Sequence, residues 1–450
     1  MKIQEKGADY LVRSQAAEWQ RGTLGELLPI KYGKSLPEKL RDTTGSHPVF
    51  GSSGRVGIHS AALTVGPTLI IGRKGNVGAI HYSSEACWPI DTVYYVEPPE
   101  GQKLRYYKYL LESLNLVKLD KSTAVPGLSR DDYNAVEVVV APPDQQDGIV
   151  AEIEKQFSRL DEAVANLKRV KANLKRYKAA VLKAAVEGRL VETEAELARR
   201  EGRSYETGGQ LLQRILETRR SQWKGKGKYK EPAAPDTTDL SELPDGWTWC
   251  GFEQISISDK HALKAGPFGS ALKKEMYIES GYKIYGQEQV ISGDPTFGDY
   301  FIDEAKYREL VSCAARPGDL LISLVGTAGK VLVLPPTALP GIINPRLLKL
   351  SLNQAFIAPA YAAYMLQSAW TKHYFKLQAH GGTMEILNLG IIKSLPVPLP
   401  PLDDQHCIVA EVDRRLSLLR ETEAQVNANH QRAGRLRQSI LSTALSGGLG

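Results

Sequence analysis

One phrase of the sequence occurs twice, far apart in the chain. Residues 144–157 read DQQDGIVAEIEKQF, and residues 403–416 read DDQHCIVAEVDRRL. Around these phrases, nine of the twenty positions from Ala141 to Leu160 are identical to those from Pro400 to Leu419, which is far above chance. A chain of 450 residues also exceeds one ordinary core. The repeat therefore constrains the fold to two related halves in series.

Shorter matches extend the repeat over most of each half. Upstream of the long match, the offset between paired segments falls from 259 to 255 and then to 251 residues, as small loop insertions would produce. A unit of this length indicates a tandem domain duplication, because solenoid repeats are only about 20 to 50 residues long. The further pairs are 180–190 with 439–449, 106–113 with 361–368, and 68–80 with 319–331.

Each half shows the same order of short elements. A Trp-containing start leads into β-branched segments that are interrupted by Gly and Pro. Gly75 and Gly78 in the first half, and Gly326 and Gly329 in the second, separate two apolar runs, which predicts a strand, a tight turn and a second strand. A helical segment follows, and then a last strand that prolines end. We therefore predict a mixed α/β domain in each half, and an α+β fold class for the chain.

After the prolines, apolar residues recur every seven positions in both halves, which predicts a long helix with a coiled-coil seam. Residues 146–186 would form a helix about 60 Å long. The second helix has polar residues at alternate seam positions (Arg415, Thr422 and Asn429), so we expect the two helices to pack on each other. The alternative is that each helix only covers its own domain. The predicted seam consists of Ile153, Leu160, Leu167, Leu174 and Val181, with Ala163, Val170, Tyr177 and Ala184 as second seam positions, and of Val412, Leu419, Val426, Ala433 and Ile440.

A segment of different character lies between the halves. Residues 197–223 can form a basic helix, and residues 224–247 are a linker rich in Lys, Gly and Pro. The linker lysines have two readings, a solvated linker or a strip that follows phosphates. The predicted segments are a first domain (1–143), a first spacer helix (144–199), a basic helix and linker (200–244), a second domain (245–402) and a second spacer helix (403–450).

Composition is that of a globular protein, with 42% apolar and 24% charged residues. No apolar run is long enough to cross a membrane, and the N-terminal residues lack the apolar stretch of a signal peptide. We therefore expect a cytoplasmic protein without membrane contact. The four cysteines, Cys87, Cys250, Cys313 and Cys407, are far apart and lack metal-ligand spacing, so we expect reduced thiols and no metal site.

The chain shows no motif of a known catalytic site. The segments YGKS at Tyr32 and GTAGKV at Gly326 are not Walker A motifs, because Leu28 and Leu324 stand where the first loop glycine belongs. NPRL at Asn344 is not the clamp with which amino-methyltransferases hold a target amine. HExxH, GxSxG, a helix-opening GxGxxG and paired-carboxylate nuclease motifs are also absent from the sequence. We therefore predict a binding protein without catalytic residues.

Two similar domains joined by helices suit a bipartite target such as DNA, on which recognition units are spaced by roughly 34 Å or its multiples. Between Lys168 and Lys230 there are 18 Lys and Arg against 7 Asp and Glu. In the domain loops, Lys and Arg could grip phosphates or read guanine, and Gln and Asn could read adenine. Each candidate also suits an ordinary surface loop. The candidates are Lys31, Lys34, Ser52, Ser53, Arg55, Arg73, Lys74 and Asn76 in the first half, and Lys264, Phe268, Ser270, Lys273, Lys274, Gln287, Thr327, Lys330 and Thr383 in the second.

Several segments resemble the specificity subunits of type I restriction-modification systems. They are GPFGSALKK (266–274), residues 380–412, VLKAAVEGRLV (181–191) and residues 206–247. The resemblance covers most of residues 120–450, and its most specific feature is the run of prolines, Gln and long helix that occurs in both halves. The first half departs from the pattern, because it has no GPFGS sequence and reads TAVPGLSRDDYNAVEVVVAPPDQQ where the second reads LNLGIIKSLPVPLPPLDDQ.

The resemblance implies two target-recognition domains, each a mixed α/β DNA-binding unit, separated by two long antiparallel helices that carry the seam and docking surface. It implies a non-catalytic subunit that directs methylation or cleavage by partners. Two methyltransferase subunits would hold S-adenosylmethionine, and restriction subunits, joined through the complex, would use ATP and Mg²⁺. Each domain would read one half of a split site in double-stranded DNA, and the divergence of the two halves predicts different half-sites.

Two other functions stay open at the level of the sequence. A non-catalytic scaffold whose domains bind proteins would show DNA affinity without sequence preference. An enzyme with an unrecognised active site would methylate or cleave DNA as the purified chain alone.

Overall fold

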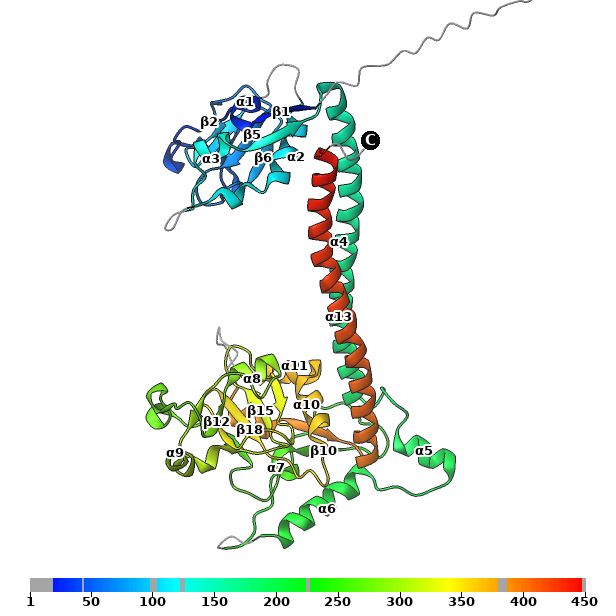
Figure 1. Ribbon diagram of the computed structural model, residues 1–450. Coiled ribbons are helices and arrows are strands. Elements are labelled where there is room, and N and C mark those ends of the chain that lie inside the picture. The colour runs from blue at the N-terminus through cyan, green and yellow to red at the C-terminus, as the bar shows by residue number, and fades with distance from the viewer. Residues whose placement is uncertain are drawn as a thin grey trace, which may run out of the picture. The chain divides into compact units, whose positions relative to one another are not determined.

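The computed structural model describes residues 19–42, 44–97, 103–121, 126–223, 227–378 and 387–446 (Figure 1). Thr383, with the rest of the predicted loop 379–383, lies outside the described residues. The chain forms two compact units, of which the first comprises residues 1–170 and 425–450 and the second residues 171–424. Each unit contains one mixed α/β domain together with parts of two long helices.

The first domain is built on three small sheets. The largest has the strand order β2-β8-β5-β6, a second has the order β4-β3-β7, and β1 pairs with β9. Helix α2 packs on the β5–β6 hairpin. The elements are β1 (Gln20–Thr23), α1 (Leu24–Leu27), β2 (Lys31–Tyr32), η1 (Glu38–Leu40), β3 (His47–Gly51), β4 (Gly54–His59), β5 (Thr68–Gly72), β6 (Ile80–Ser83), β7 (Trp88–Pro89), β8 (Val93–Val96), α2 (Leu104–Leu114), η2 (Leu116–Leu119), α3 (Arg130–Asn134) and β9 (Glu137–Val140).

The second domain repeats this topology. Its main sheet has the order β11-β18-β15-β16, its second sheet the order β13-β12-β17-β14, and β10 pairs with β19. The elements are β10 (Thr248–Gly251), α7 (Phe252–Ile255), β11 (Leu263–Ala265), η3 (Gly269–Ala271), η4 (Lys274–Met276), β12 (Tyr282–Tyr285), α8 (Gln287–Ser292), β13 (Phe301–Ile302), α9 (Glu304–Glu309), η5 (Val311–Cys313), β14 (Ala314–Ala315), β15 (Leu320–Ser323), β16 (Val331–Val333), β17 (Gly341–Ile343), β18 (Leu347–Leu350), α10 (Pro359–Gln367), α11 (Ala369–Gln378), α12 (Leu389–Ser394) and β19 (Pro396–Leu399).

The correspondence extends to strand direction and turns. Each second sheet contains the antiparallel pair β3 with β4 or β12 with β13, and the parallel pair β3 with β7 or β12 with β17. In the second domain, β14 adds a further antiparallel pair with β17. Gly75, Gly78, Gly326 and Gly329 all have φ between 70° and 78°, a conformation that suits glycine because it has no Cβ. The predicted glycine turns are confirmed, as is the predicted duplication.

A buried glutamine joins each domain to its long helix. Gln146 accepts a hydrogen bond from the backbone N–H of Lys103 at the start of α2 (3.1 Å), and its amide donates to the Ala141 carbonyl after β9 (2.9 Å). Gln405 accepts from the Ala358 N–H at the start of α10 (2.9 Å) and donates to the Pro400 carbonyl after β19 (3.2 Å). Both glutamines are fully buried. The repeated phrase therefore encodes a junction that ties a helix start to the end of the last strand.

The long helices are α4 (Pro143–Val186) and α13 (Leu402–Leu445). In the first unit, Ile153 and Phe157 of α4 share a core with Leu441 and Leu445 of α13. In the second unit, the end of α4 packs on the start of α13 instead, so the pair is antiparallel. Buried residues of each domain also pack against the segments of α4 and α13 in the same unit. The contact between the two helices in the second unit includes Val181, Leu182 and Ala185 of α4 and Ile408, Val412, Leu416 and Leu419 of α13.

The predicted seam is confirmed at its first positions and wrong at most of its second positions. Ile153 and Val181 are buried, and Leu160, Leu167 and Leu174 are half-buried. In α13, Val412, Leu419, Val426 and Ala433 are buried and Ile440 is half-buried. Ala163, Val170 and Tyr177 are exposed, with Val170 at 39% and Tyr177 at 46%. A helix that faces a single partner buries only a narrow stripe, so Ala163, Val170 and Tyr177 of α4 face outward.

The segment predicted as one basic helix forms two, α5 (Glu194–Glu201) and α6 (Gly208–Ser221). Gly202 ends α5 with φ 66°, a left-handed C-cap that suits glycine. Thr193 and Thr207 begin the two helices with capping boxes, in which the threonine hydroxyl accepts from a backbone N–H. The local capping residues therefore override the continuous helical pattern.

The glutamine junction predicts a stability effect. Gln405→Ala leaves the buried N–H of Ala358 and the carbonyls of Phe356 and Pro400 without their partner. We expect the free energy of unfolding to fall by about 1–3 kcal/mol, the typical cost of unsatisfied buried polar groups. Urea unfolding of the full chain measures the change. The matched control is Gln425→Ala, which alters an exposed glutamine of the same helix; equal unfolding midpoints for the two variants would contradict the junction.

Candidate nucleic-acid interface

The loops at one end of each main sheet form a surface that we call the turn edge. In the first domain it comprises residues 33–35, 73–79 and 90–92, which follow β2, join β5 to β6 and precede β8. In the second domain it comprises residues 266–270, 324–330 and 344–346, in the same positions relative to β11, β15, β16 and β18. The antiparallel pairings bring these loops to the same end of each sheet.

A closely packed glycine fixes the first loop of each turn edge. The N–H of Gly33 donates to the Val93 carbonyl (3.1 Å), and the N–H of Gly266 donates to the Leu347 carbonyl (2.9 Å). A Cβ at Gly33 would lie 2.0 Å from the Ile90 carbonyl oxygen, and a Cβ at Gly266 would lie 1.9 Å from that of Asn344. The first domain lacks the GPFGS sequence, yet its KYGKS segment occupies the equivalent place.

Aromatic and basic side chains meet at the turn edge of the first domain. The guanidinium of Arg73 lies 5.4 Å from the ring of Tyr32 and 5.8 Å from that of Tyr94, and it donates to the Asp91 carbonyl (2.7 Å). Arg130 lies 5.8 Å from the ring of Tyr32, whose side chain is 51% exposed. Burial, followed by the effect of Tyr32, raises the pKa of Tyr94 to about 12, so its hydroxyl stays protonated.

The other candidate DNA contacts of the first half differ in exposure and in whether another side chain already binds them. Lys34 is exposed and lies 6.0 Å from the ring of Trp88. Lys31 is occupied by an ion pair with Glu97 (2.7 Å), which raises the pKa of its ammonium. Ser52 lies in the β3–β4 hairpin close to Gly75, so this hairpin adjoins the turn edge. Ser53, Arg55, Lys74 and Asn76 are exposed on these two hairpins.

In the second domain a hydrogen-bonded group crosses the turn edge. The amide nitrogen of Gln287 donates to the Ser323 hydroxyl (2.8 Å) and to the Val325 carbonyl. The Gln287 oxygen accepts from a guanidinium nitrogen of Arg346 at 3.5 Å. The hydroxyls of Ser323 and Thr327 are 3.0 Å apart. Both amide hydrogens of Gln287 are committed within the protein, so in this arrangement it does not offer the donor and acceptor with which glutamine reads adenine.

The remaining second-half candidates that the structure describes make no side-chain hydrogen bond to this group. Phe268 is 79% exposed at the tip of the GPFGS loop. Together with Lys264, Val325 and Pro345 it lines a cavity of about 520 Å³. Ser270, Lys273, Lys274 and Lys330 are exposed. Sequence reasoning missed Tyr32, Arg130 and Arg346, although Tyr32 lies within the KYGKS loop and Arg346 immediately precedes an apolar strand.

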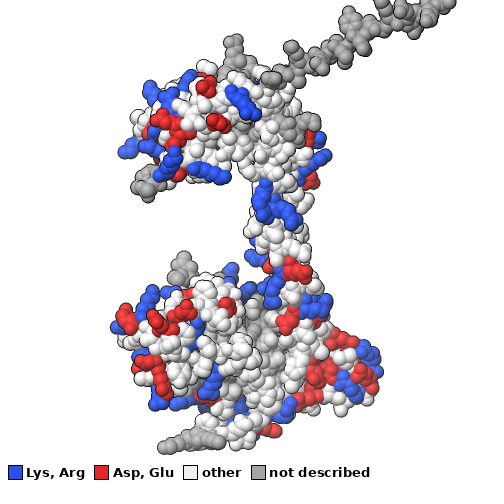
Figure 2. All heavy atoms as spheres, viewed as in Figure 1, with Lys and Arg blue, Asp and Glu red and all other residues white. Residues whose placement is uncertain are grey.

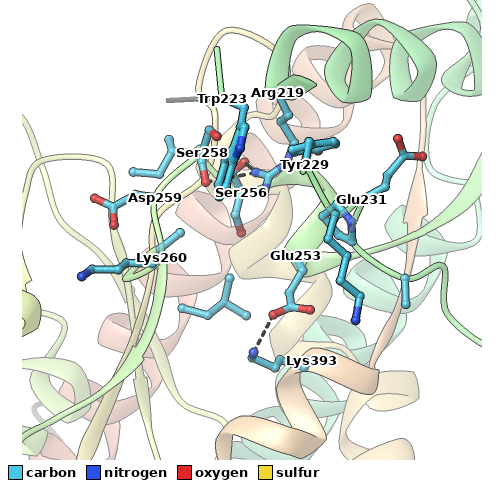
Figure 3. Close-up of a pocket in the computed structure, with 16 residues that line it drawn as sticks. Arg219, Trp223, Tyr229, Glu231, Glu253, Ser256, Ser258, Asp259, Lys260 and Lys393 are labelled. Carbon is cyan, nitrogen blue, oxygen red and sulfur yellow. Dashed lines mark hydrogen bonds and ion pairs between the residues drawn. The ribbon is translucent and has the colours of Figure 1, made fainter. Parts of the chain in front are cut away.

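The linker packs in part on the second domain. Arg219 of α6 donates to the carbonyls of Ser256 and Ile257 (3.0 Å to the latter). Beneath the linker is a cavity of about 430 Å³, beside which Lys393 and Glu253 form an ion pair (2.5 Å) (Figure 3). Lys228 and Lys230 are exposed to solvent.

Basic side chains also lie outside the turn edges. Figure 2 shows Lys and Arg on both domains and on the long helices, interspersed with Asp and Glu. In α4, Lys168, Arg169, Lys175, Arg176 and Lys178 are exposed. Within the described ranges, no three His, Cys, Asp or Glu side chains group as metal ligands. The helices described there also include none with the length and apolar character to span a membrane.

A family model described as "Type I restriction modification DNA specificity domain" matches the chain twice, at residues 16–176 and 269–428. Two specificity subunits from Escherichia coli are similar over most of the chain. The type I restriction enzyme EcoDI specificity subunit is 23% identical and covers 96% of this chain and 89% of its own length. The EcoBI specificity subunit is 24% identical and covers 85% of this chain and 73% of its own length.

A solved structure has a similar fold. It comes from work on complex assembly and conformational transition of the type I restriction-modification system, and its TM-score is 0.62. The match covers 96% of this chain and 98% of the solved chain at 17% sequence identity. The comparisons confirm the resemblance inferred from the sequence, and the solved fold confirms the predicted α+β architecture with two domains and long helices.

Because Gly266 packs closely on the Asn344 carbonyl, we expect Gly266→Ala to destabilise the second domain. The added methyl group would meet the Asn344 carbonyl, so the turn edge must shift, and overpacking of this kind costs about 1–3 kcal/mol. Thermal unfolding of the full chain should show a lowered midpoint. Gly434→Ala is the control, because a Cβ there meets nothing within 4 Å and alanine favours the helix. A Gly266 variant as stable as the control would contradict the close packing of Gly266 on the Asn344 carbonyl.

Proposed function

Because the chain belongs to the family of type I restriction-modification DNA specificity proteins, we propose that its two domains read the two halves of a bipartite site in double-stranded DNA. Family membership favours this role over a protein-only scaffold. The observation that carries the proposal is the turn edge, which has the same backbone frame in both domains. Turns with exposed basic, polar and aromatic side chains suit contacts to phosphates and base edges.

The two half-sites differ in this proposal, because the two turn edges carry different side chains. The first presents Tyr32 with Arg73 and Arg130. The second presents Arg346 with Gln287, next to the exposed Phe268. The same frame with different hydrogen-bond donors and aromatic groups would select different bases. Lys31 is less suited to contact DNA than Lys34, because its charge already pairs with Glu97.

The long helices supply the docking surface for partner subunits in this proposal. Outside the narrow seam, most side chains of α4 between residues 158 and 180 are exposed. Each helix also begins at the same glutamine junction. Two equivalent junctions suit two methyltransferase subunits, with restriction subunits joining through the complex. S-adenosylmethionine, ATP and Mg²⁺ are assigned to those partners, and no catalytic residue is assigned to this chain.

A domain exchange tests the bipartite reading. The chain with its methyltransferase partner should methylate one split sequence, and replacing residues 1–140 by those of a divergent relative should change only one half of it. Sequencing of methylated bases in a host that carries both subunits measures this result. The unexchanged chain, expressed in parallel, is the control. No split methylated site, or a change in both halves, would overturn the proposal.

The division of labour between subunits has its own test. The purified chain alone, incubated with DNA and S-adenosylmethionine or with DNA and Mg²⁺, should neither methylate nor cleave. Adding the methyltransferase subunit should restore methylation. Incorporation of labelled methyl groups and gel analysis of the DNA report the two activities, and activity of the chain alone would assign catalysis to it.

A further inference from the structure

Arg346 lies on the turn between β17 and β18, and its backbone is held on both sides. Its N–H donates to the side-chain oxygen of Asn344 (2.9 Å), and its carbonyl accepts from the N–H of Leu324 (3.0 Å). Gly266 packs so closely on this turn that a Cβ there would meet the Asn344 carbonyl. The Cα of Arg346 is therefore set by the sheet, while its side chain is exposed.

Gln287 contacts one nitrogen of the Arg346 guanidinium. The amide nitrogen of Gln287 is anchored by Ser323, which is fully buried, and by the Val325 carbonyl. This anchoring turns the amide oxygen toward Arg346 (3.5 Å). One N–H of the guanidinium is thereby occupied, and the others stay available, because Arg346 has no ion pair within the described part of the chain.

We propose that Arg346 reads a guanine in the half-site of the second domain, and that Gln287 is a positioning residue that aims its guanidinium. This inference rests on the proposed function and identifies one recognition contact within it. A guanidinium matches the two acceptors of guanine in the major groove, O6 and N7, with two parallel N–H groups. Such a fork discriminates better when its direction is restrained, and the contact with the Gln287 amide oxygen (3.5 Å) provides a restraint.

The surroundings favour base reading over a phosphate contact. A phosphate grip needs only positive charge and tolerates a mobile side chain, whereas Arg346 is tied to an amide that is itself tied to the sheet. Arg308 of the same domain differs from Arg346 in that an acidic side chain pairs with its charge. It is exposed on α9 and forms an ion pair with Glu304 (2.5 Å), so its side chain has a partner already.

The experiment uses the full chain in complex with its methyltransferase subunits. The probes are duplexes that carry the methylated site of the wild-type complex and, in turn, every single base-pair substitution in the half assigned to the second domain. Binding is measured at one fixed salt concentration. The variants are Arg346→Ala, Arg346→Lys, Gln287→Ala and the double variant of Gln287→Ala with Arg346→Ala, with Arg308→Ala as the matched control.

The wild-type complex should lose affinity by about 5- to 150-fold when the guanine is replaced, the range of one bidentate contact. Arg346→Ala should abolish this preference at that one position and keep discrimination at all others. Arg346→Lys keeps the charge but not the fork, so it should bind non-specific DNA as the wild type does and lose most of the preference. Arg308→Ala should behave as the wild type.

Gln287→Ala should reduce the preference at the same position, and the double variant should equal Arg346→Ala alone, because Gln287 acts only through Arg346. Additive losses, or a loss at a different position, would refute its positioning role. Equal weakening of all duplexes by Arg346→Ala, or an unchanged guanine preference, would overturn the reading by Arg346. If Arg346→Ala also removes discrimination in the other half-site, the complex is misfolded and Arg346→Lys decides.

Failure of this inference is distinct from failure of the proposed function. If the proposed function fails, the wild-type complex methylates no split site and the probes cannot be defined. If only the inference fails, the wild-type complex methylates a split site, while the Arg346 variants keep every base preference in it.

Discussion

The fold depends on a buried amide that occurs twice. Gln146 and Gln405 each bond the first turn of a domain helix and the carbonyl that follows the last strand, at the point where a long helix begins. A glutamine side chain can do both because it carries an acceptor and a two-hydrogen donor at its tip. An apolar residue at either position would leave these buried backbone groups without partners, at a cost that exceeds the benefit of its own burial. The domain and the helix are thus joined by hydrogen bonds as well as by packing.

In both domains, the residues that set the backbone of the turn edge differ from the residues that are exposed on it. The frame consists of backbone hydrogen bonds and glycines: Gly33 and Gly266 against opposing carbonyls, and the paired glycines of the hairpin turns. The exposed side chains on this frame differ between the domains: the first carries an arginine near two tyrosine rings on its β5–β6 turn, and the second carries an arginine bonded to an amide on the turn before β18. Because the backbone frame does not depend on its exposed side chains, the recognition surface can diverge while the fold is retained.

The features that could be predicted from the sequence are those that appear as a repeat or as a short-range periodic pattern. The duplication, the glycine turns and the first seam positions follow from such patterns and are present. The second seam positions failed at Val170 and Tyr177, because a heptad period does not state how many neighbours a helix has. The equivalence of Gly33 and Gly266 depends on carbonyls more than fifty residues away, and no local pattern records them. The sequence predicts Gln287 as a DNA contact, but its partner Ser323 is 36 positions distant. Arg346 lies in the NPRL segment, which matches no motif and so gave no signal.

The pairing of the outermost strands has a consequence for the history of such chains. In each domain the first strand lies beside the last, Gln20 opposite Val140 and Thr248 opposite Leu399. The chain therefore enters and leaves each domain at neighbouring points. A recombination event that cuts at these two points would exchange a complete domain and leave the hydrogen bonds of the other untouched. Such a chain can acquire a different domain in one recombination event, while its other domain stays unchanged.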